Sequence, residues 1–363
     1  MQEHIPHPST FIKPEYIQLI RSHAAEAEQM GMLHPAQLVL IYEQKWFKAL
    51  MPFANGGLGL SLPEIVRLQE ALSYADGSFG WVFTLCSGAG WFVGFINTDL
   101  ATSLLADEKA CLAGSGATTG TAEITDEGFV INGEWNYASG AHHATHFTAN
   151  CLIKNSHSEV LDDSDKPLVL TFILDKKDVE LLATWKYTGM VATGSHSFKI
   201  ENLKVGKERC FRIAPGFTTI DEKLYKYPFL QLAEATLAAN ISGIAIHFVE
   251  EAEKIIEQRI AMNKYTIAQQ KTLLTKISIT KADLYLRRRF FYDAIDASWG
   301  HARKKNLQRI SKASRHLARI AREHVDTLYP YCGLMAASPD TEINRAWRDL
   351  HTASQHSLLT FES

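Results

Sequence analysis

A strand-rich segment lies between two helical segments in this chain, and that order leaves few folds open. In residues 14–107 apolar residues recur at helical spacing, and Ser61 with Glu64 predicts a capping box at a helix start. Residues 110–212 are instead rich in Thr, Val, Ile and aromatic residues, with turn dipeptides between them. After residue 215, long apolar stripes return with almost no Gly or Pro. The chain therefore lacks the alternating strand–helix pattern of a nucleotide-binding sheet.

Within these segments the pattern predicts individual elements. Residues 129–131 and 135–137 alternate on either side of Asn132-Gly133, which predicts a β-hairpin. Further strands are expected at 168–174 and, as an edge pair, at 198–200 and 203–205. The last part of the chain predicts four long helices, at 230–259, 268–299, 307–328 and 341–360. Four long helices separated by short breaks are typical of a helix bundle.

The predicted class is therefore α+β, with three domains. Residues 1–108 form an N-terminal α-helical domain, residues 109–213 a middle β domain of barrel or sandwich type, and residues 214–363 a C-terminal four-helix bundle. Because fold does not determine function, the chemistry has to be argued from particular residues.

Composition excludes several partners. The 37 Lys+Arg against 40 Asp+Glu give a net charge of −3, so no global positive field attracts nucleic acid. Five singly dispersed cysteines indicate a reducing compartment, and the N-terminus lacks the basic patch and apolar run of a secretory signal, so we expect a cytoplasmic protein. The longest apolar stretch, residues 80–96, falls short of the roughly 20 residues that span a bilayer. We expect a buried helix there, and no membrane partner.

Three local clusters suggest binding sites, but an ordinary structural role fits each of them better. Residues 114–120 are rich in glycine, yet they lack the GxGxxG spacing and the lysine of a phosphate loop. In a strand, His142 and His146 would face away from His143, so no metal is expected. The run at 287–289 would fan over about 200° of a helix, which favours a solvated face or a subunit contact.

Three further segments carry a family signal when taken together. They are GEWNYASG at 133–140, WKYTGMVATGS at 185–195 and RAWRDLHTASQH at 345–356. In this order, on this domain pattern, they resemble the acyl-CoA dehydrogenase superfamily, and more closely its branch of two-component flavin-dependent monooxygenases. The resemblance covers nearly the whole chain, from residue 56 to His356.

The resemblance implies a reduced flavin, FMN or FAD, between the β domain and the bundle of a homotetramer. Tyr137 and Ser139 match positions that pack on the isoalloxazine and hydrogen-bond to it; a hydroxyl can donate or accept there. Ser115 and Thr121 match a loop that lines the flavin, and Arg259 matches an arginine that reaches a neighbouring subunit's cofactor phosphate. Two plainer roles stay open: a strand cap for Ser139 and a surface ion pair for Arg259.

The last predicted helix bears on the reaction. Common acyl-CoA dehydrogenases carry a catalytic glutamate there, and the matching position falls near Ser357; residues 350–361 contain no carboxylate. A lone hydroxyl cannot replace a carboxylate as general base at neutral pH. His356 instead matches a histidine of the monooxygenase branch, and an imidazole titrates near neutral pH. A second family histidine matches Ala89, and a surface or interface role for His356 stays open.

The resemblance thus implies the oxygenase component of a two-component monooxygenase, which receives reduced flavin from a separate reductase and uses O₂ on a small organic substrate. Ser139 and Tyr137 would position the ring, and His356 would act as base or substrate anchor. Arg348 and Asp349 would form an ion pair that holds the last helix. The alternatives are an acyl-CoA dehydrogenase-like enzyme with its base on another helix, and a flavin-binding homologue without catalysis.

Overall fold

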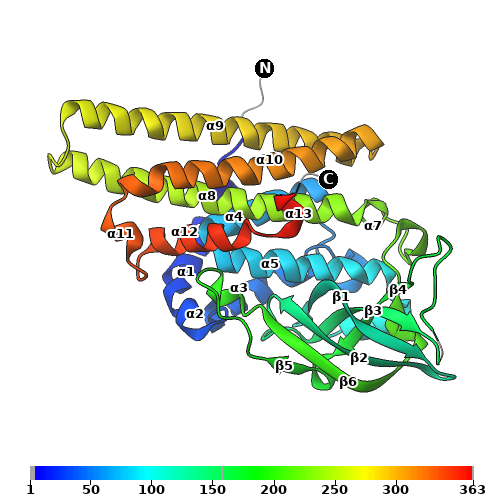
Figure 1. Cartoon of the computed structure of the whole chain (residues 1–363). Helices are drawn as coiled ribbons and strands as arrows, with labels where there is room; N and C mark the ends of the chain where they lie inside the picture. The colour runs from blue at the N-terminus through cyan, green and yellow to red at the C-terminus, as the bar shows by residue number, and fades with distance from the viewer. Residues whose placement is uncertain (1–4, 157, 362–363) are drawn as a thin grey trace.

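A computed structural model describes residues 5–156 and 158–361. Long C-terminal helices lie on one side of the molecule and the β-sheet on the other, with α5 (Gly77–Gly90) between them (Figure 1). The other helices of the first third are η1 (Pro8–Phe11), α1 (Pro14–Ser22), α2 (Ala24–Met30), α3 (Pro35–Glu43), η2 (Trp46–Lys48), η3 (Phe53–Asn55), α4 (Leu62–Ala75), η4 (Trp91–Phe95) and α6 (Thr98–Leu105).

The predicted capping box at the start of α4 is confirmed. Glu64 Oε2 accepts a hydrogen bond from the backbone N–H of Ser61 at 2.8 Å. At the other end of α4 the chain turns directly into α5, whose N-cap Asp76 accepts from the N–H of Phe79 at 2.9 Å. These caps satisfy amide groups that a helix start leaves without a partner, and they fix where α5 begins.

The middle segment forms one seven-stranded mixed sheet of order β5-β6-β2-β1-β3-β4-β7. Its strands are β1 (Leu112–Ile124), β2 (Gly128–Ala138), β3 (His146–Lys154), β4 (Val169–Asp175), β5 (Glu180–Leu182), β6 (His196–Gly206) and β7 (Cys210–Phe211). β1 pairs parallel to β3, and the other neighbours pair antiparallel. The strand predicted at 168–174 is confirmed as β4.

Two strand predictions are wrong. The expected hairpin turn at Asn132-Gly133 lies inside the continuous strand β2, where a bulge interrupts the pairing with β6. Asn132 Oδ1 accepts from the N–H of Asn202 at 2.8 Å, and a Cβ on Gly133 would come within 2.6 Å of the Gly120 backbone. The glycine therefore serves a close backbone approach instead of a turn. The expected edge pair at 198–205 is one strand, β6, with neighbours on both sides.

The C-terminal segment contains α7 (Lys223–Lys226), α8 (Phe229–Ala261), α9 (Ile267–Gly300), α10 (Lys304–Leu328), η9 (Tyr329–Tyr331), α11 (Leu334–Ala337), α12 (Glu342–Ala353) and α13 (Ser357–Thr360). The first three predicted long helices are confirmed as α8, α9 and α10. The fourth, at 341–360, is wrong as a single helix because the chain breaks after α12. His356 then caps the short helix α13.

The two most apolar helical stretches lie in the core. Residues 77–95 and α8 are long and apolar enough to cross a membrane, but 83% and 89% of their most apolar windows are buried inside the protein. The buried helix expected near residues 80–96 is therefore confirmed. Side chains of α5 and α8 share one hydrophobic core with the N-terminal helices, and the sheet encloses a second core.

One polar cluster inside the helical core corrects a sequence interpretation. Arg288, expected on a solvated face or a subunit contact, is buried and donates two 2.7 Å hydrogen bonds to the Glu70 carboxylate. Tyr292 and Ser242 donate two more, at 2.5 and 2.6 Å. Burial alone would raise the pKa of Glu70, but the Arg288 charge and these hydrogen bonds hold it below its usual range. The cluster ties α9 to α4.

Candidate active site

Ser139 and His356 meet at Trp81, a residue of α5. The indole Nε1–H of Trp81 donates to Ser139 Oγ at 3.1 Å, and the indole ring lies 6.2 Å, centroid to centroid, from the His356 ring. Ser139 directly follows β2, and His356 caps α13. Residues from the sheet, the first helical segment and the end of the bundle therefore come together at one place.

A local distortion of β2 places Tyr137 and Ser139 on different sides. Tyr137 has a φ of 67°, in the left-handed region, and the pairing with β6 shifts register between Trp135 and Ala138. As a result Ser139 is 6% exposed, whereas Tyr137 is 60% exposed. A bulky residue in this backbone region costs about 1–3 kcal/mol, and such strain gathers at functional sites because the surrounding structure must hold it.

Tyr137 belongs to an exposed aromatic cluster with Trp185 and Tyr187. The rings of Trp185 and Tyr187 lie 4.2 Å apart, and the hydroxyls of Tyr137 and Tyr187 lie 3.3 Å apart. The Trp185 ring is held in place, because its Nε1–H donates to the carbonyl of Met190 at 2.8 Å. An aromatic surface of this kind can pack against a flat ring system.

His356 is held by its role as a helix cap. Its Nδ1 accepts from the N–H of Leu358 at 3.3 Å, so in the neutral imidazole the proton sits on Nε2. Burial lowers the pKa of His356 below its usual range, which favours this neutral form. In this conformation the side chain offers an N–H donor, which favours the role of substrate anchor over that of base.

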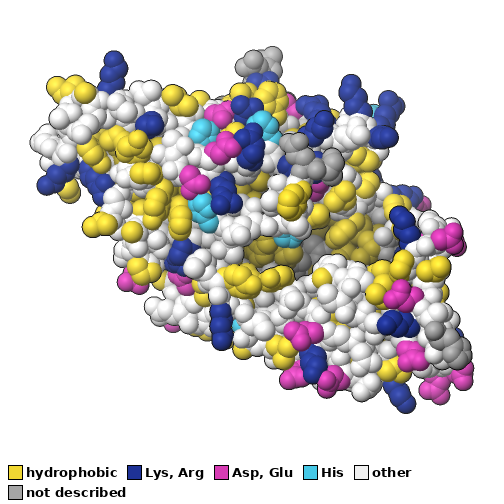
Figure 2. Space-filling model, in the orientation of Figure 1, with side chains coloured by type: hydrophobic (Ala, Val, Ile, Leu, Met, Phe, Trp, Pro, Cys, Tyr) yellow, Lys and Arg dark blue, Asp and Glu magenta, His cyan; other side chains and the backbone are white. Residues whose placement is uncertain are grey.

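Open space lies beside the same face of α5. Trp81, Leu85 and Gly88 are spaced to share one helix face, and a Cβ added at Gly88 would meet no atom within 4 Å. Ala89, where the family has its second histidine, is buried. Figure 2 shows a hollow between the helical part and the sheet part, with hydrophobic side chains along its walls.

These features fit a flavin ring. Ser139 Oγ accepts one hydrogen bond from Trp81 and is paired with Ser195 at 2.8 Å, which leaves one acceptor position of the hydroxyl unused. Gly88 leaves room, and the aromatic cluster around Tyr137 supplies flat apolar surface. Ser139 therefore offers a polar contact to an isoalloxazine and Gly88 leaves room for it, whereas stacking of the ring on the Tyr137 cluster stays a prediction.

Two other predicted flavin contacts, Ser115 and Thr121, lie on the neighbouring strand. Ser115 and Thr121 lie on β1, on either side of a bulge, and Ser115 Oγ accepts from the N–H of Ala117 at 3.3 Å. Among the described residues, neither forms a side-chain hydrogen bond with Ser139 or His356. Their roles toward a flavin stay predictions.

Arg259 lies near the C-terminal end of α8 and holds a turn of its own chain. Its guanidinium donates to the carbonyls of Tyr331 and Cys332 at 3.0 and 2.8 Å. These bonds fix the connection between α10 and α11. The predicted contact of Arg259 with a neighbouring subunit's cofactor stays a prediction.

The expected ion pair of Arg348 with Asp349 is wrong. Arg348 forms a bidentate pair with Glu28 of α2, whereas Asp349 is 1% exposed and accepts from the N–H of Met190 at 2.5 Å. Successive residues on a helix point about 100° apart, so the two side chains reach different partners. Burial, together with the nearby Asp76 charge, raises the pKa of Asp349 to about 7.

Asp349→Asn is expected to remove a pH dependence of stability. In the folded protein Asp349 keeps its proton up to a pKa of about 7, whereas the unfolded chain ionises near 3.8. Wild-type stability is therefore lost as pH rises through this window. Asparagine mimics the protonated carboxyl, so the melting temperature of the variant relative to wild type should rise between pH 5 and 8. Asp340→Asn, at an exposed position, is the control. A constant difference across this range would contradict the expectation.

The three clustered histidines have separate partners. His143 Nε2 accepts from the N–H of Leu33 at 3.3 Å, whereas His146 Nε2 lies 3.4 Å from a carboxylate oxygen of Asp175. The ring of His142 packs edge-on against His196. Burial lowers the pKa of each of the three. The His143 contact joins the middle segment to the N-terminal helices, whereas the contacts of His142 and His146 lie within the middle segment.

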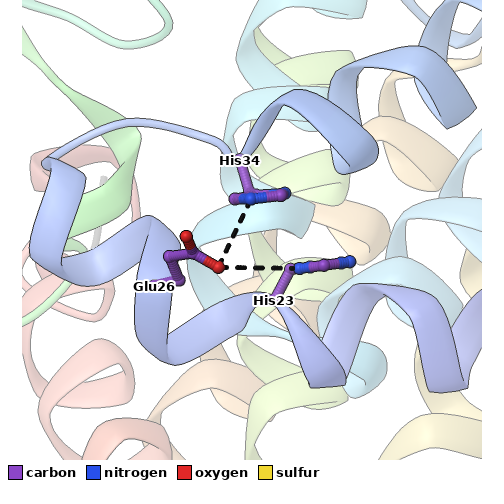
Figure 3. Close-up of side chains that lie close together, drawn as sticks. All are labelled: His23, Glu26 and His34. Carbon is purple, nitrogen blue, oxygen red and sulfur yellow. Dashed lines mark ion pairs between the residues drawn. The ribbon is translucent and has the colours of Figure 1, made fainter.

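A second cluster, His23, Glu26 and His34, brings potential metal-ligand atoms within 4.8 Å of one another. The two imidazole rings stack with 4.1 Å between centroids and 4° between planes, and Glu26 lies beside both (Figure 3). A metal ion binds imidazole in the plane of the ring, and two parallel planes have no common point. In this arrangement the histidines cannot chelate one ion, and the prediction that the chain holds no metal stays a prediction.

Comparison with known proteins fits this architecture. Residues 235–361 match the family "Acyl-CoA dehydrogenase, C-terminal domain". The HsaA monooxygenase structure from M. tuberculosis superposes with a TM-score of 0.86 at 19% identity, covering 95% of this chain and 93% of that one. XiaF from Streptomyces sp., solved with FADH2 and glycerol, superposes with a TM-score of 0.83 at 20% identity. This match covers 95% of this chain and 89% of XiaF. The chain has the acyl-CoA dehydrogenase fold, as predicted.

Sequence relatives identify the branch. An indole-3-acetate monooxygenase from Pseudomonas putida is 28% identical over 86% of this chain and 80% of its own length. The HsaA oxygenase subunit of a flavin-dependent monooxygenase from Rhodococcus jostii is 22% identical over 93% of this chain and 91% of its own length. The homologues of this chain are thus oxygenases of two-component flavin-dependent monooxygenases. The predicted family and enzyme class are confirmed.

Three residues of the site were not singled out from the sequence: Trp81, Ser195 and Thr193, whose Oγ1 lies 2.6 Å from Ser195 Oγ. Trp81 follows Gly80 at the start of the apolar stretch, and the other two lie in the segment at 185–195 that carries part of the family signal. Their proximity to Ser139 depends on how this loop packs behind β2. For Thr193 and Ser195, the available signal was a hydroxyl side chain inside a segment that carries the family resemblance.

Proposed function

We propose that this chain is the oxygenase component of a two-component monooxygenase that inserts oxygen into a small aromatic substrate. The observation that carries the proposal is the meeting of Ser139, Trp81 and His356 beside the open face of α5. Relatives named for indole-3-acetate and p-hydroxyphenylacetate, both aromatic, support an aromatic substrate. A separate flavin reductase is the partner that this role requires.

The chain's own residues would bind and orient the reactants. Ser139 would hold the polar edge of a reduced flavin, FMN or FAD, and Tyr137 with its aromatic neighbours would pack near the ring. The reduced flavin supplies electrons to O₂. His356 would donate through Nε2 to a polar group of the substrate, with Nδ1 occupied by the Leu358 amide. The walls of the hollow would exclude water from the reacting atoms.

Other parts of the proposal concern the protein as a whole. A homotetramer in the cytoplasm is proposed, with Arg259 facing a neighbouring subunit's cofactor and Ser115 and Thr121 lining the flavin. The absence of a carboxylate from residues 350–361 supports oxygenation over removal of an α-proton from a thioester. An acyl-CoA would therefore not bleach the protein's oxidised flavin.

Supplying reduced flavin under isotopically labelled O₂ tests the proposal. The chain would be mixed with FMN or FAD, a flavin reductase, NADH and a panel of indoles and phenols. Label should appear in at least one product, and omission of the chain should abolish it. Absence of labelled product from the whole panel, together with no binding of reduced flavin, would contradict the proposed function.

A further inference from the structure

A buried line of hydroxyl groups leads from Ser139 away from the candidate active site. Ser139 Oγ lies 2.8 Å from Ser195 Oγ, which lies 2.6 Å from Thr193 Oγ1, and Thr193 Oγ1 lies 2.7 Å from the carbonyl oxygen of Met190. The three hydroxyl residues are 6%, 3% and 1% exposed, so water does not complete their hydrogen bonds from outside. Each hydroxyl has one hydrogen to donate.

The carbonyl at the end of the line determines the direction of every bond. The Met190 oxygen can only accept, so the Thr193 hydroxyl must donate to it; otherwise two oxygens would face each other at 2.7 Å without a hydrogen between them. Thr193 then has no hydrogen left for Ser195. Ser195 must donate to Thr193, and by the same reasoning Ser139 must donate to Ser195.

The two ends of the line are held in place. The Met190 backbone has a φ of 56°, its N–H donates to Asp349 at 2.5 Å, and its carbonyl also accepts from Trp185. At the other end the Trp81 indole, which is a donor only, donates to Ser139 Oγ at 3.1 Å. The Ser139 hydroxyl thus gives its hydrogen inward and keeps a single lone pair free.

We infer that Thr193 and Ser195 are positioning residues that make Ser139 a hydrogen-bond acceptor only, so that the site selects reduced over oxidised flavin. This inference rests on the proposed function. The reduced ring carries N5–H, a donor, whereas N5 of the oxidised ring is an acceptor. Ser139 can accept from the first. It could donate to the second only by breaking the line at Ser195. The freedom to donate or accept, expected from the sequence, is therefore absent here.

Thr193→Val tests this inference, because valine keeps the shape of threonine and removes its hydroxyl. Ser195 would lose the acceptor for its hydrogen and could donate to Ser139, which could then donate outward. Oxidised flavin should bind more tightly, and the ratio of its Kd to that of reduced flavin should fall about five- to tenfold, the value of one hydrogen bond. Both constants are measured by titration, the reduced form under anaerobic conditions.

Two more variants complete the experiment. Thr193→Ser retains the hydroxyl, so the ratio of the two Kd values should stay as in the wild type. If Thr193 acted only through its shape, the serine variant would not be expected to preserve this ratio. Ser195→Ala removes the acceptor of Ser139 directly and should lower the ratio even if the valine variant does not fold. An unchanged ratio in folded Thr193→Val or Ser195→Ala would overturn the inference. If the wild type bound no reduced flavin at all, the proposed function itself would fall.

Discussion

His356→Asn should lower kcat/KM for the aromatic substrate by about 10- to 150-fold, the usual contribution of a hydrogen bond to a charged group. Asparagine is a favourable N-cap, so its side-chain oxygen can replace Nδ1 in accepting from the Leu358 amide. The group lost is the Nε2–H that faces away from the cap. Steady-state turnover with reductase-supplied flavin measures the effect.

Stability and pH separate the chemistry of His356 from its capping role. The free energy of unfolding of the asparagine variant should lie within about 0.5 kcal/mol of the wild-type value. His356→Ala should lower it by about 0.5 to 2 kcal/mol, because alanine cannot cap the helix. Since burial lowers the pKa of His356, protonation of Nδ1, which breaks the cap to the Leu358 amide, should affect the wild type only at pH values below the ordinary histidine range. Turnover of His356→Asn within about threefold of wild type would contradict a role in catalysis.

Arg288→Met should cost about 3 to 5 kcal/mol of the free energy of unfolding, because it leaves the fully buried Glu70 carboxylate without its counter-charge. Tyr292 and Ser242 would still donate to this carboxylate, but neither carries a charge. Urea unfolding followed by circular dichroism measures the loss. In the variant, burial without the arginine would raise the pKa of Glu70, so the variant, unlike the wild type, should become less stable as pH rises.

The neighbouring arginine provides a matched control. Arg287 lies on the same helix and pairs with Asp283 in a partly exposed position. Arg287→Met should change stability by no more than about 1 kcal/mol, the usual range for exposed pairs. Equal losses in the two variants would show that burial does not set the strength of the Arg288 pair.

The sequence predicted the long elements well because their signals are local. The apolar stripes of α8, α9 and α10 extend over many turns, and a capping box needs only Ser61 and Glu64. The Asn132-Gly133 signal failed because its outcome depends on β6, a strand about 70 residues later in the chain. Local preference for a turn lost to pairing with a distant strand.

The site was predictable in its members but not in its connections. Ser139 and His356 were selected through a family resemblance, and the structure brings both to Trp81. The hydroxyl line through Ser195 depends on how the loop before β6 packs against the end of β2, which no periodicity records. The Arg348–Asp349 pairing, by contrast, could have been rejected from helix geometry alone.

The shared helical core has a consequence for biosynthesis. The apolar faces of α4 and α5 pack on α8, and Glu70 of α4 finds its counter-charge more than 200 residues later, on α9. While the ribosome is still adding the sheet, the first hundred residues have no surface on which to bury these faces. Since contacts between residues far apart in the chain form late, these faces of the nascent N-terminal third stay unpaired until α8 and α9 have emerged.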